Sequence, residues 1–419
     1  MMLGDCSLEE IYNKVKSRVH VSEEGIPHVE PSEELEELKE CVISLTVGGE
    51  LKKIVSELEE VKKSVERLVS ILNLKGFTYP REFSSFINDP MHHLKKKLFN
   101  YVYDLIRGKI SLEEFTRRAS AAVRTSVRTN MRTAYQIWGI TSIMAILAEK
   151  GFTLSYPEHG FINFDRSGKQ RLGIIPPNAI LFSFKKGFIS IFHEAPRPIA
   201  WEDTSDLKRI WKLYTALRPD VMVYGGAVFN IVNLDSDPPI ARPDVIIEFK
   251  ELNDWYERVR DLRGYFRKPL TAEEWRSKWL EGLFEGLADI MGISRVEAKE
   301  RVEEAKPLRI REYQLIRLYK KTYKPKKTIL VSRCKLPSTV KKELEEAGIT
   351  VYDNIGFNAR ALEPVAKQLE DIAKFSGSNV KLVISPETAE LLARAIDVLG
   401  LANPDTIIRK ALERMLNHD

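Results

Sequence analysis

Residues 217–226, LRPDVMVYGG, and residues 242–252, RPDVIIEFKEL, decide the interpretation of the middle of this chain. In both, Arg-Pro-Asp leads into a short run of apolar and β-branched residues, a pattern that predicts two strands. In the second strand Glu248 and Lys250 are two residues apart and therefore share a face, while Val245, Ile247 and Phe249 face the other way. A carboxylate and an ammonium beside an apolar strand are costly to bury, so the pair indicates a chemical task.

Two aspartates compete to complete a metal site with Glu248. Mg²⁺ or Mn²⁺ takes carboxylate oxygens as ligands, and the neighbouring lysine can orient an attacking water or stabilise charge on a phosphate. Asp244 lies four residues from Glu248, about 13 Å along a strand, which is too far for both to hold one ion. Asp220 can lie beside Glu248 if the two strands pair, so we expect Asp220.

The residues around these strands alternate between strand and helix patterns. This alternation predicts a mixed or parallel α/β sheet with helices on its faces, over residues 151–360. In chain order we expect a β-hairpin at 180–195 turning at Lys186-Gly187, a helix at 203–217, strands at 220–224 and 244–252, a charged helical insertion at 253–309, a strand at 328–332, a helix at 338–348 and a strand at 349–355.

The central residues resemble the PD-(D/E)xK, or restriction-endonuclease-like, nucleases. Pro219-Asp220 is similar to the PD element of that superfamily, and Glu248-Phe249-Lys250 is similar to its (D/E)xK element. The resemblance implies an α/β nuclease core in which Asp220 and Glu248 hold Mg²⁺ or Mn²⁺ and Lys250 assists the attacking water. It also implies one more acid from a preceding helix or strand, for which Glu194 and Glu202 are the candidates.

Residues 311–332 are similar to the helix and strand that complete such a core. Gln314 and Tyr319 in this segment are similar to the glutamine and tyrosine of helicase-associated exonucleases of the superfamily, although here they are five residues apart and not four. The long spacer 221–247 and the insertion 253–309 also depart from the family's pattern. The same helix carries basic residues that would contact a phosphate backbone, namely Lys320, Lys321 and Lys324.

Residues 1–76 predict two helices, 32–47 and 51–72, separated by Gly48-Gly49. In the second helix apolar residues alternate in steps of three and four, which is typical of a coiled-coil seam. Either a helical hairpin within one chain or a dimerising coiled coil would bury this seam.

Residues 77–150 predict a helical region that carries a stripe of arginines. Arg117, Arg124, Arg128 and Arg132 project from one helical face, and residues 116–148 contain no acid. Like charges four residues apart repel, so the stripe indicates an external anion, for which a nucleic-acid phosphate is the obvious source. The alternative is pairing with acids from elsewhere in the fold.

Residues 376–419 predict a small module that cannot bury a core alone. A short strand, a helix ending at Gly400 and a second helix opening at Asn403-Pro404 resemble a ribbon-helix-helix domain, in which two chains pair their strands. The resemblance implies that Lys381 faces DNA from the ribbon and that Asn403 meets phosphate at a helix start. The alternative is a helical hairpin that only dimerises the protein.

Composition narrows the class of protein. The chain has 419 residues, with 65 Lys plus Arg against 60 Asp plus Glu and a net charge of +5, which excludes a histone-like binder. Three widely spaced cysteines argue against a disulfide scaffold, an iron–sulfur cluster and a zinc ribbon. Without a long apolar segment or a signal sequence, we expect a cytoplasmic protein with no membrane contact. Only four glutamines occur, which favours a heat-adapted source.

The sequence therefore predicts a multidomain α and α/β protein: an N-terminal helical or coiled-coil region, a restriction-endonuclease-like core and a C-terminal ribbon-helix-helix module. The expected function is that of a Mg²⁺-dependent deoxyribonuclease with a dimerising DNA-binding tail, acting as a homodimer or higher oligomer. One alternative is a non-enzymatic DNA-binding protein, for regulation, segregation or packaging, whose nuclease-like core is inactive. Another is a coiled-coil assembly protein with no nucleic-acid role.

Overall fold

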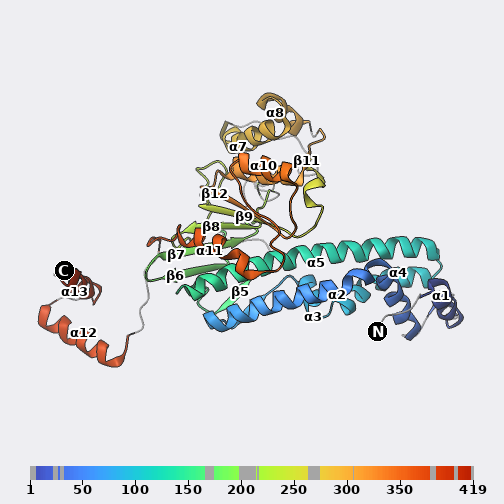
Figure 1. Cartoon of the computed structure of the whole chain (residues 1–419), viewed down its shortest axis with the longest axis horizontal. Coiled ribbons are helices and arrows are strands. Elements are labelled where there is room, and N and C mark those ends of the chain that lie inside the picture. Colours follow the sequence, from blue (N-terminus) through green and yellow to red (C-terminus); the bar gives the residue numbers. More distant parts are fainter. Residues whose placement is uncertain are drawn as a thin grey trace. The chain divides into compact units, whose positions relative to one another are not determined.

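The structure is a computed structural model of the whole chain (Figure 1). It forms two units, Met1–Ser376 and Gly377–Asp419. The first unit joins the expected N-terminal helical regions and the α/β region in one body, and the second begins one residue after the expected start of the C-terminal module. The structure describes residues 6–21, 27–28, 33–165, 174–197, 214, 217–262, 274–304, 306–377, 384–400 and 404–416.

Long helices form one layer of the first unit. They are α1 (Leu8–Ser17), α2 (Glu33–Leu72), α3 (Arg81–Asn88), α4 (Pro90–Ile106) and α5 (Leu112–Glu149).

The predicted break at Gly48-Gly49 is wrong, because α2 continues through both glycines. Each glycine costs a helix about 1 kcal/mol, a penalty that burial of the flanking apolar residues outweighs. The seam of residues 51–72 packs against α5 of the same chain. The two helices run parallel, since Thr46 contacts Ser120 at 3.0 Å and Ser64 contacts Thr141 at 2.8 Å. The seam is therefore buried within the chain, but by α5 and not by the first half of a hairpin.

A seven-stranded sheet lies on these helices, in the order β13-β12-β9-β8-β7-β6-β4. Strands β9, β12 and β13 are parallel, and the other neighbours are antiparallel, which confirms a mixed sheet. The expected hairpin is present, with Ser183 opposite Gly187. The strands are β4 (Thr153–Tyr156), β6 (Ala179–Ser183), β7 (Gly187–His193), β8 (Val221–Gly225), β9 (Val245–Lys250), β12 (Lys327–Ser332) and β13 (Thr350–Tyr352).

The other elements surround this sheet. The expected insertion 253–309 is not entirely helical, because β10 within it pairs with β11. The helix predicted at 203–217 lies outside the described residues, apart from Tyr214 and Leu217. The remaining elements of the first unit are β1 (His20–Val21), β2 (Pro27–His28), β3 (Gly76–Thr78), β5 (Phe161–Asn163), η1 (Trp255–Glu257), β10 (Val259–Asp261), α7 (Glu274–Met291), α8 (Arg295–Glu303), β11 (Arg309–Arg311), α9 (Glu312–Tyr323), α10 (Ser338–Glu346), η3 (Ala359–Leu362) and α11 (Glu363–Glu370).

Both faces of the sheet are covered. On β9, Ile247 and Phe249 join the core shared with α2 and α5, whereas Ile246 joins a second core with α7 and α9. Gly139 of α5 lies directly against the Phe249 ring, and a Cβ atom there would overlap the ring. This close approach fixes α5 beneath the strand that carries Glu248 and Lys250.

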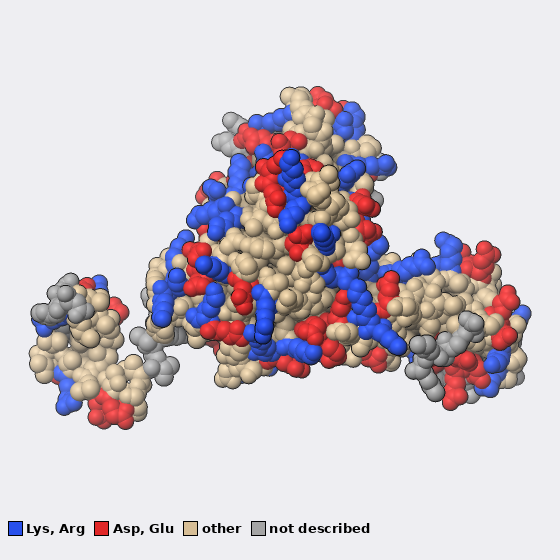
Figure 2. All heavy atoms as spheres, viewed as in Figure 1, with Lys and Arg blue, Asp and Glu red and all other residues tan. Residues whose placement is uncertain are grey.

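Charge of both signs covers the surface. Figure 2 shows Lys and Arg side chains interspersed with Asp and Glu over the visible face of the first unit. This mixture agrees with the small net charge of +5. Any strong anion-binding site must therefore be local.

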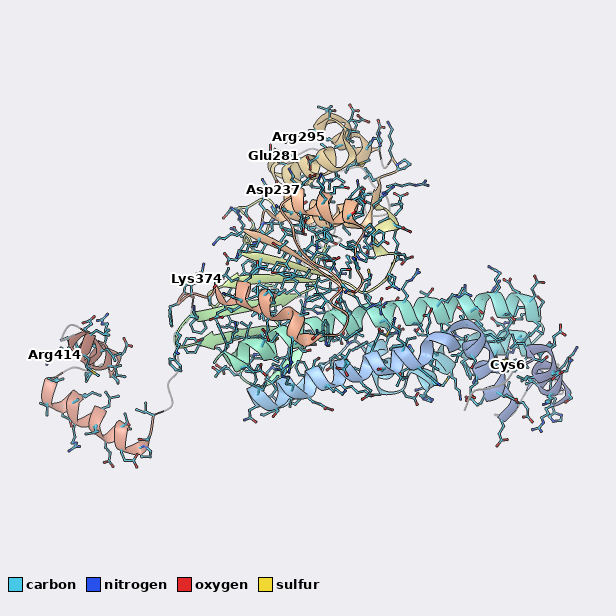
Figure 3. All side chains as sticks on the ribbon, in the orientation of Figure 1. Cys6, Asp237, Glu281, Arg295, Lys374 and Arg414 are labelled. Atoms are coloured by element: carbon cyan, nitrogen blue, oxygen red, sulfur yellow. A yellow bond between two sulfur atoms is a disulfide. The ribbon has the colours of Figure 1, made fainter. Side chains whose placement is uncertain are left out.

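One disulfide corrects an expectation from the cysteine spacing. Cys6, at the N-terminal end of the helical layer, is bonded to Cys41 of α2 (Figure 3). The wide spacing in sequence did not prevent pairing, because α1 packs on α2. Cys334 is a free cysteine.

The second unit contains two helices, α12 (Pro386–Leu399) and α13 (Pro404–Leu416). The α12 helix begins after Ser385, whose side chain accepts the Thr388 N–H, and ends at Gly400 with φ 61°. The described apolar residues of both helices are largely exposed, and only Ile407 of α13 is buried among them. Lys381 and Asn403 lie outside the described residues. Across both units, no described helix is long and apolar enough to cross a membrane.

Candidate active site

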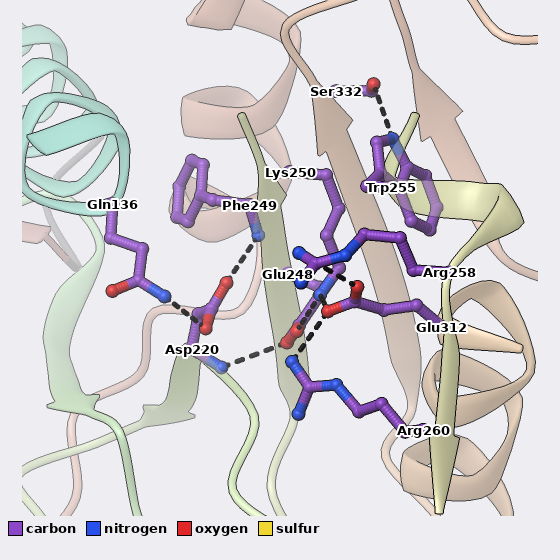
Figure 4. A network of polar contacts seen from close by, with 10 residues as sticks. All are labelled: Gln136, Asp220, Glu248, Phe249, Lys250, Trp255, Arg258, Arg260, Glu312 and Ser332. Carbon is purple, nitrogen blue, oxygen red and sulfur yellow. Dashed lines mark hydrogen bonds and ion pairs between the residues drawn. The ribbon is translucent and has the colours of Figure 1, made fainter. Parts of the chain in front are cut away.

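Strands β8 and β9 bring Asp220 and Glu248 together at one end of the sheet. Their register pairs Val221 with Ile247, so the residue before β8 lies opposite Glu248. The Asp220 N–H donates to Glu248 Oε2 at 3.0 Å, and the Phe249 N–H donates to Asp220 Oδ2 at 2.8 Å (Figure 4). The two carboxylates are buried side by side, as the strand-pairing argument predicted.

Lys250 connects this pair to a second acidic group. Its Nζ donates to Glu248 Oε1 at 2.8 Å and lies 3.5 Å from Glu312 Oε1, at the start of α9. Glu312 is also held by Arg260 at 2.6 Å and lies 3.9 Å from Arg258. The lysine is therefore fixed between two carboxylates.

Helix α5 supplies the remaining contact to the pair. Gln136, buried on α5, donates from Nε2 to Asp220 Oδ1 at 2.5 Å. Each of the four carboxylate oxygens of Asp220 and Glu248 therefore accepts a hydrogen bond from the protein. The Gly139 contact, one helical turn further along, fixes the position of α5 from which Gln136 reaches the site.

The electrostatics of the pair follow from its burial. Burial raises the pKa of Asp220, and burial together with the charge of Asp220 raises the pKa of Glu248 to about 7. Burial alone would lower the pKa of Lys250, but Glu248 and Glu312 outweigh it and raise that pKa. Lys250 thus stays protonated. Because Arg260 already pairs with Glu312, the uncompensated charge is that of Asp220 and Glu248, which one lysine cannot neutralise when both are ionised.

This excess of negative charge suits a divalent cation. Carboxylate oxygens are the ligands that Mg²⁺ and Mn²⁺ prefer, and a bound cation would remove the repulsion between Asp220 and Glu248. In the described part of the chain, no three His, Cys, Asp or Glu side chains converge as a ready metal cluster. Asp220 and Glu248 would supply two of the oxygen ligands of such an ion.

A third acid, Glu194, follows β7 next to the pair. Its N–H donates to the Asp220 carbonyl oxygen at 2.7 Å, and its side chain is buried. Its charge contributes to raising the pKa of Asp220, after burial. The other acid considered, Glu202, lies outside the described residues.

Asp244 lies at the opposite end of β9. Its Oδ2 accepts the Gly225 N–H at 2.8 Å, and its Oδ1 pairs with Lys326 at 2.6 Å. The strand separates Asp244 from Glu248, as the strand-length argument predicted.

The structure separates the expected accessory pair on α9. Gln314 Oε1 accepts the Arg311 N–H at 2.7 Å and so caps the start of α9, with no contact to the carboxylates. Tyr319 is buried near the site, where burial and then the charge of Glu248 raise its pKa well above the usual value. Glu312, and not Gln314, is the α9 residue that reaches Lys250.

Two of the expected basic residues at the end of α9, Lys320 and Lys321, make side-chain contacts within the fold. Lys320 donates to the carbonyl oxygens of Ala347 and Gly348 at 2.6 and 2.8 Å, and so binds the end of α10. Lys321 lies 3.7 Å from Asp289. Lys324 ends α9 in the left-handed region at φ 46°. Two of the three N–H donors of Lys320 are used by these two carbonyl oxygens, and contact of this residue with a phosphate backbone stays a prediction.

The arginine stripe is exposed along α5 and leads to the site. Arg117 pairs with Glu114 at 2.7 Å, but Arg124, Arg128 and Arg132 have no hydrogen bond or ion pair with any described residue. Arg132 lies close enough to Asp220 for its charge to oppose the rise in that pKa. The stripe's step of four residues, continued once more, reaches Gln136.

Gln136, Glu312 and Arg260 are the residues of the site that the sequence did not reveal. Gln136 could have been found by continuing the arginine series, since it lies four residues after Arg132. Glu312 and Arg260 gave no such signal, because Glu312 meets Lys250, and Arg260 meets Glu312, only through the packing of α9 and β10.

Comparison with protein-family models, curated proteins and solved structures gives no match.

Proposed function

We propose that this protein is a metal-dependent nuclease that hydrolyses phosphodiester bonds in DNA, using Asp220, Glu248 and Lys250. The observation that carries the proposal is the buried Asp220–Glu248 pair with Lys250 bonded to Glu248 at 2.8 Å. Two adjacent buried carboxylates and one lysine leave an excess negative charge that a divalent cation would balance. The resemblance to PD-(D/E)xK nucleases rests on these same residues.

The proposed roles follow from the contacts. Asp220 and Glu248 would provide carboxylate oxygens to Mg²⁺ or Mn²⁺. Such an ion, when bound, polarises a phosphate and lowers the pKa of a bound water. Lys250 is kept protonated and can donate a hydrogen bond to an attacking water or to a phosphate oxygen. Gln136 orients Asp220, and Glu312 holds Lys250 in place.

Nucleic-acid binding would use α5 and the second unit. Arg124, Arg128 and Arg132 are exposed and lack internal partners among the described residues, as phosphate-binding side chains require. The uncovered apolar residues of α12 and α13 support pairing with a second copy, because a two-helix unit cannot bury them alone. We thus propose DNA as the partner and a homodimer, or higher homo-oligomer, as the working form.

A second function, DNA binding without cleavage, is favoured by one observation. All four oxygens of the carboxylate pair already accept protein hydrogen bonds, and Asp220, Glu248 and Lys250 are each less than a tenth exposed. A core that has lost its metal would be stabilised by such complete hydrogen bonding.

Cleavage assays separate the two functions. The full-length protein is incubated with single-stranded, duplex and branched DNA, with and without Mg²⁺ or Mn²⁺. We expect metal-dependent cleavage that Lys250→Ala and Asp220→Asn abolish while DNA binding persists. Asp244→Asn is the matched control, because that aspartate lies at the other end of β9, and it should keep its activity. Binding without cleavage by the wild type supports the second function, and wild-type rates in Lys250→Ala refute the assigned site.

A further inference from the structure

A cavity of about 510 Å³ lies between α2, α5, the chain following β9 and the end of β12. Its size is within the range of roughly 300–1,000 Å³ that is usual for small-molecule sites. The residues that matter for what it can bind are Arg124, Arg128, Glu251 and Arg333. None of them belongs to the Asp220–Glu248–Lys250 site.

Glu251 lines this cavity and lacks a full set of hydrogen-bond partners. The residue is 7% exposed, and its Oε2 has no hydrogen-bond partner. Its Oε1 lies 3.6 Å from Arg333, whose guanidinium is engaged by Glu57 at 2.7 Å and by the Glu251 carbonyl oxygen at 2.7 Å. Buried polar atoms are rarely left unpaired, because desolvation without a partner costs free energy. Because Oε2 has almost no accessible surface in this structure, a ligand with a hydrogen-bond donor would bind the Glu251 carboxylate after it rotates toward the cavity.

Two guanidinium groups supply the complementary charge. Arg124 and Arg128 line the cavity one helical turn apart, and neither has a hydrogen bond or ion pair with a described residue. Like charges at this spacing repel, and a phosphate between them would remove the repulsion. Arg117, on the same face but outside the cavity, is paired with Glu114.

The acids in the cavity limit the kind of anion that fits. Glu50 and Asp254 line the same space, so a ligand that carried only negative charge would be repelled from part of it. The ligand must combine a phosphate with donor groups.

We propose that this cavity binds a nucleotide, with its phosphate on Arg124 and Arg128 and an amino or hydroxyl group donating to Glu251. A nucleotide carries both kinds of group and is small enough for about 510 Å³. It can be a free nucleotide or one unit of a nucleic-acid strand, since both present the same chemistry. The inference does not require cleavage.

Calorimetric titration of the full-length protein at low salt, without divalent cations, tests this site. The probes are adenosine monophosphate and a short single-stranded oligonucleotide. We expect binding of at least one probe, and at least about tenfold weaker binding by the Arg124→Ala/Arg128→Ala variant, since hydrogen bonds to charged groups are lost. Arg295→Ala/Arg301→Ala, which removes two arginines of α8, is the matched control and should bind as the wild type does. Glu251→Gln should weaken binding by roughly tenfold, through loss of the charged acceptor.

The outcomes decide the source of the nucleotide and the inference itself. Binding of adenosine monophosphate identifies a free nucleotide, and binding of the oligonucleotide alone identifies a strand. No binding of either probe, or an equal loss in the α8 control, overturns the inference. Thermal unfolding of each variant shows whether it folds. If Glu251→Gln does not fold, the double arginine variant still tests the site, because its changes are on the surface. Lys250→Ala should still bind the probe, so a loss of DNA cleavage can be distinguished from a loss of nucleotide binding in this cavity.

Discussion

Replacing Glu248 by Gln should change how the stability of the fold depends on pH. Burial and the charge of Asp220 raise the pKa of Glu248 from its usual 4.5 to about 7. Between those values the folded state binds a proton that the unfolded state has released. Stability therefore falls as the pH rises through this window, and the loss is complete above the folded pKa. At about 1.4 kcal/mol per pKa unit, the charged Glu248 costs the fold about 3 kcal/mol at pH 8.

The measurement is urea unfolding of the wild type and Glu248→Gln at several values between pH 4 and pH 8. The difference between the two proteins removes the contribution of groups common to both, such as Glu251, whose pKa burial also raises to about 7. We expect this difference to shift by about 3 kcal/mol in favour of the Gln variant as the pH rises. A difference that stays constant with pH would show that the pKa of Glu248 is the same in the folded and unfolded states, and would refute the raised pKa.

Added Mg²⁺ extends the same experiment to the metal. If Asp220 and Glu248 bind the ion, Mg²⁺ at one hundred times its dissociation constant should stabilise the wild type at pH 8 by about 2.7 kcal/mol. Glu248→Gln should gain much less and should not cleave DNA. Equal stabilisation of both proteins would place the ion elsewhere.

Four further variants test the packing around the site and the tail. Gly139→Ala should destabilise the fold by about 1–3 kcal/mol in urea unfolding, because its new methyl group overlaps the Phe249 ring. Gly49→Ala, with no neighbouring atom within 4 Å, should instead stabilise it by up to about 1 kcal/mol, and equal effects would contradict the packing. Gln136→Leu should cost about 1–3 kcal/mol and slow cleavage, because one oxygen of the neighbouring aspartate loses its donor; unchanged unfolding and kinetics would exclude that role. Deleting 377–419 should lower the mass in light scattering and weaken DNA retention while metal-dependent cleavage remains, and an unchanged mass and affinity would remove the dimer proposal.

The sequence was sufficient where local pattern and simple geometry decide the structure. The two apolar runs around Asp220 and Glu248 became paired strands, since their β-branched residues suit a buried sheet. The fixed rise of a strand then separated Asp244 from Glu248. The strand pattern and the strand rise together identified Asp220 and Glu248 as the candidate carboxylates. Both depend only on residues a few positions apart in the sequence.

The sequence was insufficient where packing between distant segments decides. Gly48 and Gly49 favour a break, but burial against α5 keeps α2 continuous. Gln136 meets Asp220 across 84 positions of the chain, and Glu312 meets Lys250 across 62. Periodicity within one segment carries no information about contacts between residues so far apart in the chain.

Helix α5 sets the distance between the arginines of the cavity and the carboxylate pair. It is one uninterrupted helix of 38 residues, and it carries both the arginines of the cavity and the glutamine that touches Asp220. Eight residues separate Arg128 from Gln136, a rise of about 12 Å. At about 3.4 Å per nucleotide, a strand anchored at the cavity would reach the carboxylates after roughly three to four nucleotides. The length of the released fragment would then be set by the length of α5 between Arg128 and Gln136, and not by the base sequence of the DNA.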